Sequence, residues 1–173
     1  PGRLEQSAGR TARTAREALS RLEMRVPPPV VMALCGAIAW GLVQAWPSAL
    51  VALPSSLRLI LVASLTVLGL LLNLLPKLAF GRAGTTVNPL RPASSRTLVT
   101  TGLHGVSRNP MYLGHALLLV AWACWLRHPA ALIGAPLYMA YVTRYQILPE
   151  ELALSATFGT AYDAYRARVR RWL

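Results

Sequence analysis

The chain has 173 residues, of which 54% are hydrophobic and only 14% are charged, so it has too few polar side chains to cover an ordinary water-soluble globule. Its formal net charge is +12, a value that in a soluble chain would suggest nucleic acid. However, residues 26–57, 59–76 and 109–126 carry no charged side chain, and a nucleic-acid-binding domain does not keep its arginines out of such stretches. The sequence therefore indicates an integral membrane protein with no nucleic-acid partner.

Residues 1–26 form a separate basic segment. Six arginines are spread through it among small residues, with few large apolar side chains between them. Such a segment is typical of an amphipathic helix that lies on anionic lipid, or of a disordered tail. We expect no signal peptide, because no cleavage pattern follows the first apolar stretch.

Four apolar segments have the length of a membrane-spanning helix or approach it. A span needs about 20 apolar residues, within a range of about 17–25. The candidates are residues 29–46, 57–79, 110–126 and 129–148. Pro76 is expected to kink or end the second, and Pro110 occupies a favoured first position of the third. The fourth crosses the bilayer only if Arg144 lies near a membrane face.

The basic residues also predict the orientation. The connection at residues 47–56 carries no Lys or Arg, whereas residues 77–108 and both ends of the chain carry most of them. Because cations favour the cytoplasmic side, we expect both termini and the loop at residues 80–109 to be cytoplasmic, in a bacterial inner membrane. The predicted fold is an all-α membrane bundle of about four spans over residues 27–148, followed by a helical juxtamembrane segment at 149–173.

Polar side chains collect where the long loop meets the third span. Pro110 biases Asn109 away from the helical region and leaves Arg108 in the loop, while Tyr112 and His115 share a helix face just inside. Two glycines before this turn make a backbone contact with a ligand plausible: Gly102 and Gly105. Alternatively, Asn109 caps the helix, Arg108 reaches lipid phosphate and Tyr112 is an interfacial aromatic residue.

A second cluster surrounds the few acidic residues of the membrane part. Glu150 and Glu151 follow Pro149, and the first turn of a new helix would favour one such charge more readily than a pair. Ionisable residues at a membrane boundary are functional candidates by default. We therefore expect catalytic roles for Arg144, Glu151 and His115. Carboxylates at this place suit a ligand that bears hydroxyls or a positive charge.

The other notable side chains have simpler interpretations. Arg166, Arg168, Arg170 and Arg171 are interpreted as a basic helix attracted to anionic lipid, with Trp172 as its anchor. The two cysteines lie in apolar stretches and predict free thiols, and the three histidines are too scattered for a metal site. No dinucleotide fingerprint follows a strand, and there is no Walker lysine loop.

Two motifs resemble those of a known family. Residues 107–114 read Ser-Arg-Asn-Pro-Met-Tyr-Leu-Gly, and they are followed by Pro-Glu-Glu at 149–151, Phe-Gly at 158–159 and Val-Arg-Arg-Trp at 169–172. Over residues 80–173 the chain is similar to the isoprenylcysteine carboxyl methyltransferase and phospholipid methyltransferase family of membrane enzymes. Asn109 stands where the isoprenylcysteine branch has histidine, Leu103-His104 stand where many relatives have Pro-Tyr, and four spans look more like the phospholipid branch.

The resemblance implies an enzyme that uses S-adenosylmethionine to methylate a lipophilic or amphipathic acceptor at an amine, carboxylate, thiol or hydroxyl. Arg108, Asn109 and Tyr112 would contact the amino-acid part of the cofactor or shape its pocket. The glycines would let backbone amides approach, and Glu150 or Glu151 would hold its ribose or ammonium. The implied cofactor-binding set is Gly102, His104, Gly105, Arg108, Asn109, Tyr112, Gly114, Glu150 and Glu151, with no metal.

Two other classes of function stay open at this point. A membrane reductase of the sterol-reductase type would use NADPH, whose 2′-phosphate would explain clustered arginines, although the paired glutamates suit hydroxyls and an ammonium better. A non-catalytic membrane adaptor would keep the fold and bind only lipid.

Overall fold

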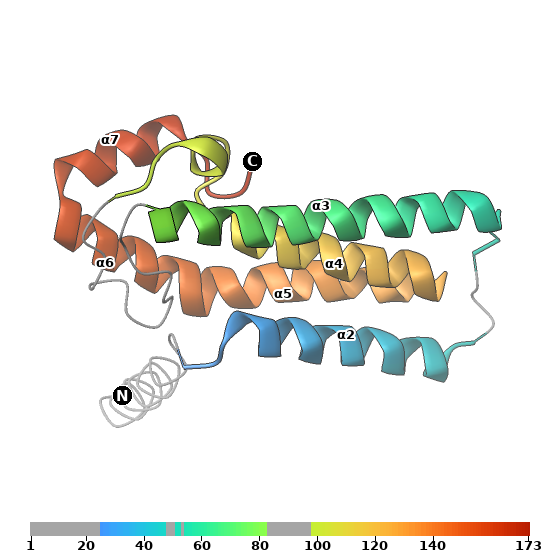
Figure 1. Ribbon diagram of the computed structural model, residues 1–173. Coiled ribbons are helices and arrows are strands. Elements are labelled where there is room, and N and C mark those ends of the chain that lie inside the picture. Colours follow the sequence, from blue (N-terminus) through green and yellow to red (C-terminus); the bar gives the residue numbers. More distant parts are fainter. Residues whose placement is uncertain (1–24, 48–50, 53, 83–97) are drawn as a thin grey trace, which may run out of the picture.

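The computed structural model in Figure 1 describes residues 25–47, 51–52, 54–82 and 98–173. In chain order its helices are α2 (Pro28–Ala45), α3 (Ser55–Arg82), the 3-10 helix η2 (Gly102–Gly105), α4 (Pro110–Leu126), the 3-10 helix η3 (Pro129–Ile133), α5 (Gly134–Val142), the π-helix η4 (Thr143–Ile147), α6 (Leu148–Phe158) and α7 (Thr160–Arg168). No strand occurs in these residues, which confirms the all-α prediction. The predictions for residues 1–24 and for most of the loop at 80–109 lie outside the described residues.

Two of these helices are long and apolar enough to cross a membrane, namely α2 and the part of α3 from Ser55 to Ala79. α4 is a shorter apolar helix of 17 residues that begins at Pro110, as predicted. The number of spans, expected to be about four, and their orientation remain predictions. Pro76 was expected to kink or end the second segment; it does not end it, because this buried proline lies inside α3, which continues to Arg82, and a kink stays a prediction. Neighbouring elements can compensate a proline within an apolar helix.

The fourth predicted segment is not one uniform helix. α4 ends at Leu126, the next residue Arg127 has a left-handed conformation with φ 52°, and the chain then turns into η3. From there η3, α5, η4 and α6 follow one another without an intervening loop. Pro149 lies in the first turn of α6, directly after the π-turn, and does not break this series.

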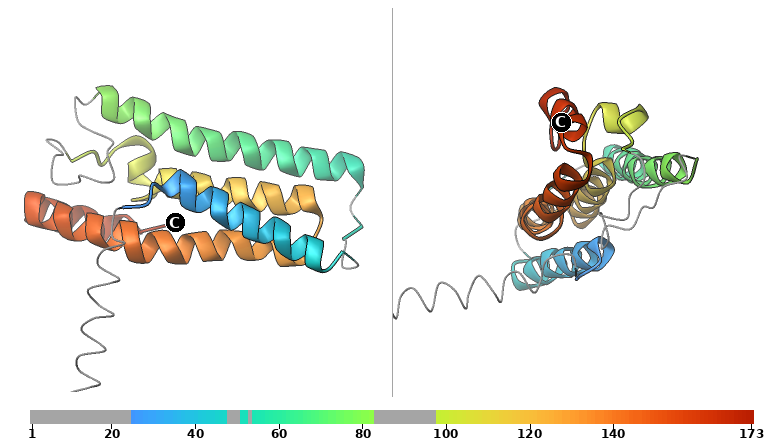
Figure 2. Two further views of the ribbon diagram at one scale, coloured as in Figure 1. Left: turned by 90° about the horizontal axis from the view of Figure 1, so that it is seen from below. Right: turned by 90° about the vertical axis from the view of Figure 1, so that its left-hand side faces the viewer.

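The long helices lie side by side, and the loop-side elements gather at one end (Figures 1 and 2). This end holds the start of α2, the end of α3, η2, α6, α7 and the C-terminus. At the other end the His128 ring nitrogen Nε2 lies 2.8 Å from the Trp46 carbonyl, and the Val51 N–H donates to the Arg127 carbonyl at 2.7 Å. The predicted functional residues therefore lie around one end of the bundle.

α3 packs along α4 through small residues. A Cβ added to Gly114 would lie 2.6 Å from the Gly69 carbonyl oxygen, and one added to Gly69 would lie 2.9 Å from the Gly114 carbonyl oxygen. The two backbones are so close that neither position has room for a side chain. The packing of α3 on α4 therefore requires glycine at position 114.

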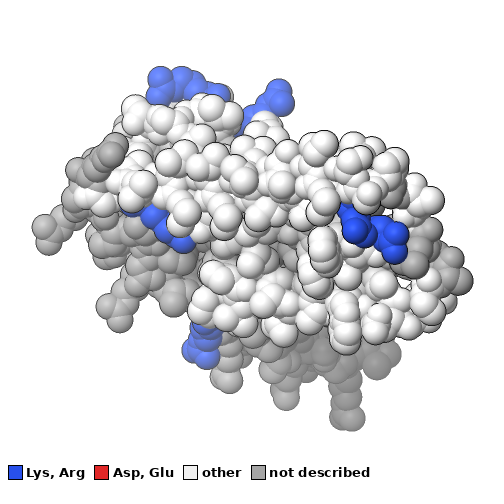
Figure 3. All heavy atoms as spheres, turned by 45° about the vertical axis from the view of Figure 1, so that its right-hand side comes forward, with Lys and Arg blue, Asp and Glu red and all other residues white. Residues whose placement is uncertain are grey.

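The core lies between α2, α4 and α5, and the outside of the bundle is apolar. Val31 and Cys35 of α2 pack with Leu119 of α4 and with Tyr138 and Val142 of α5. Large apolar side chains along α3 are exposed. On the face in Figure 3, the described residues show a few separate basic side chains and no acidic one. Such an exterior suits lipid rather than water.

Candidate active site

The centre of the candidate site is Glu151, which is shared by two arginines. Its Oε1 lies 2.9 Å from Nη2 of Arg108 and accepts from Nε of Arg171 at 3.0 Å. Its Oε2 accepts from Nη2 of Arg171 at 2.8 Å. The side chains of Arg108 and Glu151 are each 9% exposed, against 35% for Arg171. One buried carboxylate thus faces two cations, which leaves a net positive charge.

Arg108 has hydrogen-bond donors that are unpaired within the described residues. Its Nε and Nη1 atoms are buried and have no hydrogen-bond partner within the described part of the chain. These two atoms carry three of the five N–H groups of a guanidinium. Because buried donors are almost always paired, the unpaired side of Arg108 is suited to receive the oxygens of an anionic group.

The C-terminal residues fasten the turn that carries Arg108. The Arg108 N–H donates to the Arg170 carbonyl at 3.0 Å, and the Asn109 side-chain amide donates to the Arg171 carbonyl at 3.0 Å. Ser107 Oγ accepts from the Asn109 N–H at 3.1 Å and donates to the Arg171 carbonyl at 3.4 Å. Asn109 therefore stands at the N-cap position of α4 without making the side-chain capping bond of the alternative interpretation.

Sequence reasoning missed the role of this C-terminal segment. Arg171 turns to Glu151, and the partly buried Trp172 packs against the core of the bundle. A role of Trp172 as an interfacial anchor stays a prediction. The basic helix was predicted from its arginines, of which Arg166 and Arg168 are exposed on α7. The Val-Arg-Arg-Trp motif could have indicated this role. A helix that only lies on lipid needs basic and aromatic residues in no fixed order, so a fixed order suggests specific contacts within the protein.

Glu150 lies beside the same cluster and is bound to α4. The Tyr112 hydroxyl donates to Glu150 Oε1 at 2.5 Å. The pKa of Glu150 is raised to about 8, mainly by burial; the hydrogen bond from Tyr112 lowers it, and the charge of Glu151 adds to the rise. Glu150 can therefore gain or lose a proton near neutral pH. Glu151, which is 8% exposed, is turned into the bundle.

η2 brings the loop glycines to the same end of the bundle. Gly102 has φ +62°, a conformation that favours glycine, and both Gly102 and Gly105 are exposed. His104 between them is buried, its carbonyl accepts from the Tyr165 hydroxyl at 2.7 Å, and burial lowers the pKa of its ring. α7 thus holds η2 in place through Tyr165.

His115 belongs to a separate polar network inside the bundle. Lys77 Nζ donates to Asn73 Oδ1 at 2.6 Å, so the Asn73 amide nitrogen faces His115 Nε2, 2.8 Å away. The same nitrogen lies 3.5 Å from the Met111 carbonyl, which fixes the amide orientation. Nε2 is then an acceptor, and the ring is neutral with its proton on Nδ1, donated to Tyr138 Oη at 2.7 Å.

The structure thus brings some predicted residues together and places others elsewhere. Arg108, Glu151 and Asn109 are joined through Arg171, and the Tyr112–Glu150 pair lies next to them because Glu150 precedes Glu151 in the chain. His115 and Gly114 lie deeper in the bundle, toward α3. Arg144 is exposed, with its guanidinium 5.3 Å from the centre of the Tyr145 ring. No group of three potential metal ligands occurs among the described residues.

Comparison with known proteins identifies the family. The family model described as phospholipid methyltransferase matches residues 57–161, more than half of the chain. The chain belongs to the phospholipid methyltransferase family. This confirms the resemblance drawn from the motifs and makes the protein a membrane methyltransferase by family. The matched region includes Arg108, Glu150 and Glu151 but not Arg171.

A curated relative that is shorter than this chain also matches it. An "Uncharacterized protein" of Haemophilus influenzae is 40% identical over 63 residues, which are 36% of this chain and the whole of that relative. No solved structure matches the chain.

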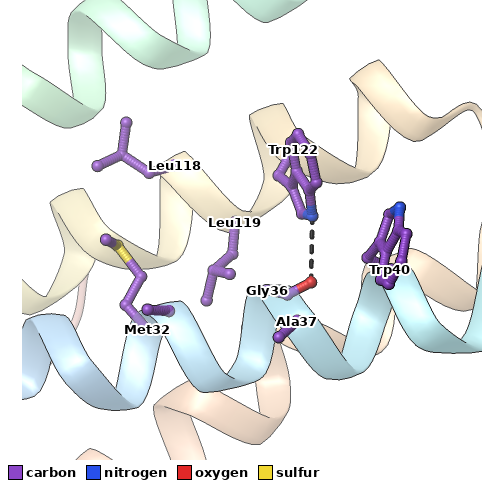
Figure 4. A pocket seen from close by; sticks show the side chains of 8 residues that line it. Met32, Gly36, Ala37, Trp40, Leu118, Leu119 and Trp122 are labelled. Atoms are coloured by element: carbon purple, nitrogen blue, oxygen red, sulfur yellow. Dashed lines mark hydrogen bonds between the residues drawn. The ribbon is translucent and has the colours of Figure 1, made fainter.

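An apolar groove runs along the side of the bundle between α2 and α4 (Figure 4). Its volume is about 480 Å³, and it is open to the surroundings. The Trp122 indole donates to the Gly36 carbonyl at 3.2 Å across one part of it. The lining is Met32, Ala33, Gly36, Ala37 and Trp40 of α2 with Leu118, Leu119 and Trp122 of α4. In a membrane methyltransferase this groove offers a lipophilic molecule a lateral place on the bundle.

Proposed function

We propose that the protein transfers a methyl group from S-adenosylmethionine to a lipophilic or amphipathic acceptor. The observation that carries this proposal is the buried Arg108 guanidinium, whose Nε and Nη1 lack partners in the described residues while Glu151 holds its Nη2. The cofactor bears a carboxylate, an ammonium and ribose hydroxyls. Donors on Arg108 and acceptors on Glu150 fit these groups, and both lie within the region matched by the family.

Each residue has a distinct task in this proposal. Arg108 binds the carboxylate, and Glu151 acts as a positioning residue that holds the guanidinium. Glu150, itself held by Tyr112, accepts from the ammonium or a ribose hydroxyl. The exposed backbone at Gly102 and Gly105 allows close approach of the ligand. The bound cofactor supplies an electrophilic methyl group: a lone pair of the acceptor forms the new bond to carbon while the carbon–sulfur bond breaks, leaving a thioether.

The protein then contributes mainly position and exclusion of water, which suffice for much of the acceleration of an in-line displacement. The α2–α4 groove supports an acceptor with an apolar part, because all of its lining side chains are apolar. His115 and Arg144 were predicted to be catalytic. We place His115 in a supporting role, since Nε2 and Nδ1 both have protein partners. We keep Arg144 as a candidate contact for the acceptor.

Binding of S-adenosylhomocysteine to the detergent-purified protein tests the proposal. Calorimetry should show saturable binding by the parent chain. Arg108→Gln should weaken it about 10- to 150-fold, because a charge-assisted hydrogen bond contributes roughly 1.5–3 kcal/mol. Arg166→Gln is the matched control, since that arginine is exposed on α7 and pairs only loosely with Asp163 at 3.7 Å. It should bind like the parent.

Glu151→Gln tests whether Glu151 acts by holding the Arg108 guanidinium in position. It should weaken binding and also destabilise the fold, because it leaves two arginines without their shared carboxylate. A parent chain that shows neither heat nor a thermal shift with S-adenosylhomocysteine would remove the proposed function. Stabilisation by NADPH alone would favour the reductase alternative, and a response to neither ligand would favour the adaptor.

A further inference from the structure

The π-helix η4 marks an irregular place at the join of α5 and α6. Its five residues, Thr143–Ile147, end where the Leu148 N–H donates to the Thr143 carbonyl, one residue wider than an α-helical bond. Such single π-turns are rare and frequently occur at functional sites. The extra residue changes which side chains of the following helix face inward. In η4 it leaves Gln146 and Ile147 completely buried.

Only one of the two polar atoms of the Gln146 side chain has a hydrogen-bond partner in the described residues. Its Nε2 donates to the Val26 carbonyl at the start of α2, at 2.8 Å. Its Oε1 is buried and has no donor in the part of the chain that the structure describes. The amide cannot be turned round, because the Val26 carbonyl can only accept and must face the nitrogen. A buried acceptor without a donor is unusual and calls for an explanation.

The hydrogen bond to Val26 does not explain why the Oε1 atom of Gln146 is buried without a partner. A side chain needed only to link α5 to α2 requires a donor, and burying a second polar atom beside it without a partner costs stability. The hydrogen bond to Val26 therefore explains Nε2 and leaves Oε1 for something that the protein itself does not supply.

The neighbouring polar residue shows what kind of group fits. Gln146 lies near Glu150 on the inner side of the bundle, because Val26, whose carbonyl Gln146 binds, packs against the core cluster that contains Tyr112, the hydrogen-bond partner of Glu150. Glu150 also presents acceptor oxygens, one of them held by Tyr112. A ligand that reaches this place meets acceptors and should present N–H donors. S-adenosylmethionine has two such groups, its α-ammonium and the amino group of its adenine.

We propose that the Oε1 atom of Gln146 accepts a hydrogen bond from an amino group of the bound cofactor. Gln146 is then a cofactor-binding residue contributed by the π-turn, outside the two sequence motifs. This rests on the proposed function, because it takes S-adenosylmethionine as the ligand. The chemistry required is an N–H donor, and analogues of the ligand distinguish its two sources.

The experiment compares three ligands by calorimetry on the full chain in detergent. The ligands are S-adenosylhomocysteine, its analogue without the α-amino group, and S-inosylhomocysteine, in which oxygen replaces the adenine amino group. Gln146→Met should weaken binding of the first ligand about 10- to 150-fold if the donor is the ammonium, and about 2- to 10-fold if it is the neutral adenine amine. The loss should vanish for the one analogue that lacks the contacted group.

Two further variants control for the fold. Thr143→Ala removes another hydrogen bond of the same π-turn, from the Thr143 hydroxyl to the Met139 carbonyl at 2.6 Å, and should leave all three affinities unchanged. Gln146→Glu keeps an acceptor oxygen but loses the donor to Val26, so it should bind S-adenosylhomocysteine at least as tightly as the parent. It also serves as the test if Gln146→Met does not fold.

The outcomes separate this inference from the proposed function. Equal losses for all three ligands, no loss with Gln146→Met, or a loss of the same size with Gln146→Glu would overturn the role of Gln146. If the parent chain binds S-adenosylhomocysteine and the Gln146 variants bind it with the same affinity, only this inference is refuted. A parent chain that does not bind the ligand refutes both.

Discussion

Glu151 is shared by two arginines, and this sharing decides which atoms of the site are left for a ligand. Both of its oxygens accept from guanidinium groups, so Glu151 orients Arg108 and fixes the segment around Arg171. The sequence shows the paired glutamates but not their partners, because Arg171 lies 20 residues beyond Glu151 and meets it only through the turn between α6 and α7. The two glutamates consequently have different surroundings and different tasks.

Glu150 makes the stability of the fold depend on pH. Burial raises its pKa from the usual 4.5 to about 8, so between these values the folded protein holds a proton that the unfolded chain releases. The resulting stabilisation is complete below pH 4.5 and is lost as the pH rises through 8. Thermal unfolding from pH 5 to 9 should show the parent losing stability relative to Glu150→Gln, which keeps a neutral side chain.

Asp163→Asn is the control for this measurement. Asp163 is exposed and lies 3.7 Å from Arg166, so replacing it should not change the slope of stability with pH. Parallel curves for the parent and Glu150→Gln over this range would show that Glu150 is ionised in the folded protein, and would contradict the assignment.

Individual residues differ in how well the sequence predicted them. The convergence of Arg108, Tyr112 and Glu150 followed from motifs whose spacing places them at the ends of two helices. Gln146 carried no such signal, because a single amide in an apolar stretch looks like any buried polar residue. Its significance depends on a π-turn, and one extra residue in a helical turn leaves no mark on apolar periodicity.

At the scale of elements, the packing of α3 on α4 determines where the inner polar network lies. The close approach at Gly69 and Gly114 brings Asn73 within 2.8 Å of His115. Because α3 is apolar on its remaining faces, this network and the glycine contact fix the register between the two helices.

Replacing Gly114 should separate these helices. In Gly114→Ala the new Cβ would lie 2.6 Å from the Gly69 carbonyl oxygen, a backbone atom that cannot move aside, so we expect a loss of about 1–3 kcal/mol. Gly41→Ala in α2 is the matched control, because a Cβ there meets nothing within 4 Å. It should be neutral or slightly stabilising. Thermal unfolding in detergent measures both, and equal midpoints would contradict the predicted close approach.

The helices were predicted well where proline and apolar length set their ends. The bounds of α2 and α4 agree closely with the segments expected at residues 29–46 and 110–126. Pro76 misled the prediction because a proline interrupts a helix in water more readily than in an apolar setting. No pattern in the sequence predicts that residues 129–148 divide into η3, α5 and η4.

At the scale of the whole molecule, the distribution of charge predicts the side of the membrane on which the site lies. The end of the bundle that carries α6, α7 and the C-terminus also carries most of the described arginines, whereas the connection between α2 and α3 has none. The positive-inside rule therefore predicts that this end faces the cytoplasm.

Cysteine labelling tests that orientation. In a background with Cys35 and Cys124 replaced by alanine, a membrane-impermeant maleimide should label Ser56→Cys in intact cells. It should label Arg168→Cys only after the cells are made permeable. Both positions are exposed and lie at opposite ends of the bundle. Labelling of Arg168→Cys in intact cells would reverse the predicted topology.

The fastening of the Arg108 turn by Arg170 and Arg171 also sets an order of events during synthesis. Asn109 and Arg171 are 62 positions apart, so at about 5–20 residues per second the ribosome makes the second several seconds after the first. Glu151, the carboxylate that binds Arg108, is synthesised 20 positions before Arg171, so it is available before the segment that fastens the Arg108 turn. The apolar bundle therefore assembles around an unfinished charged end, and the nascent chain acquires its ligand-binding geometry only when translation reaches the segment after α7.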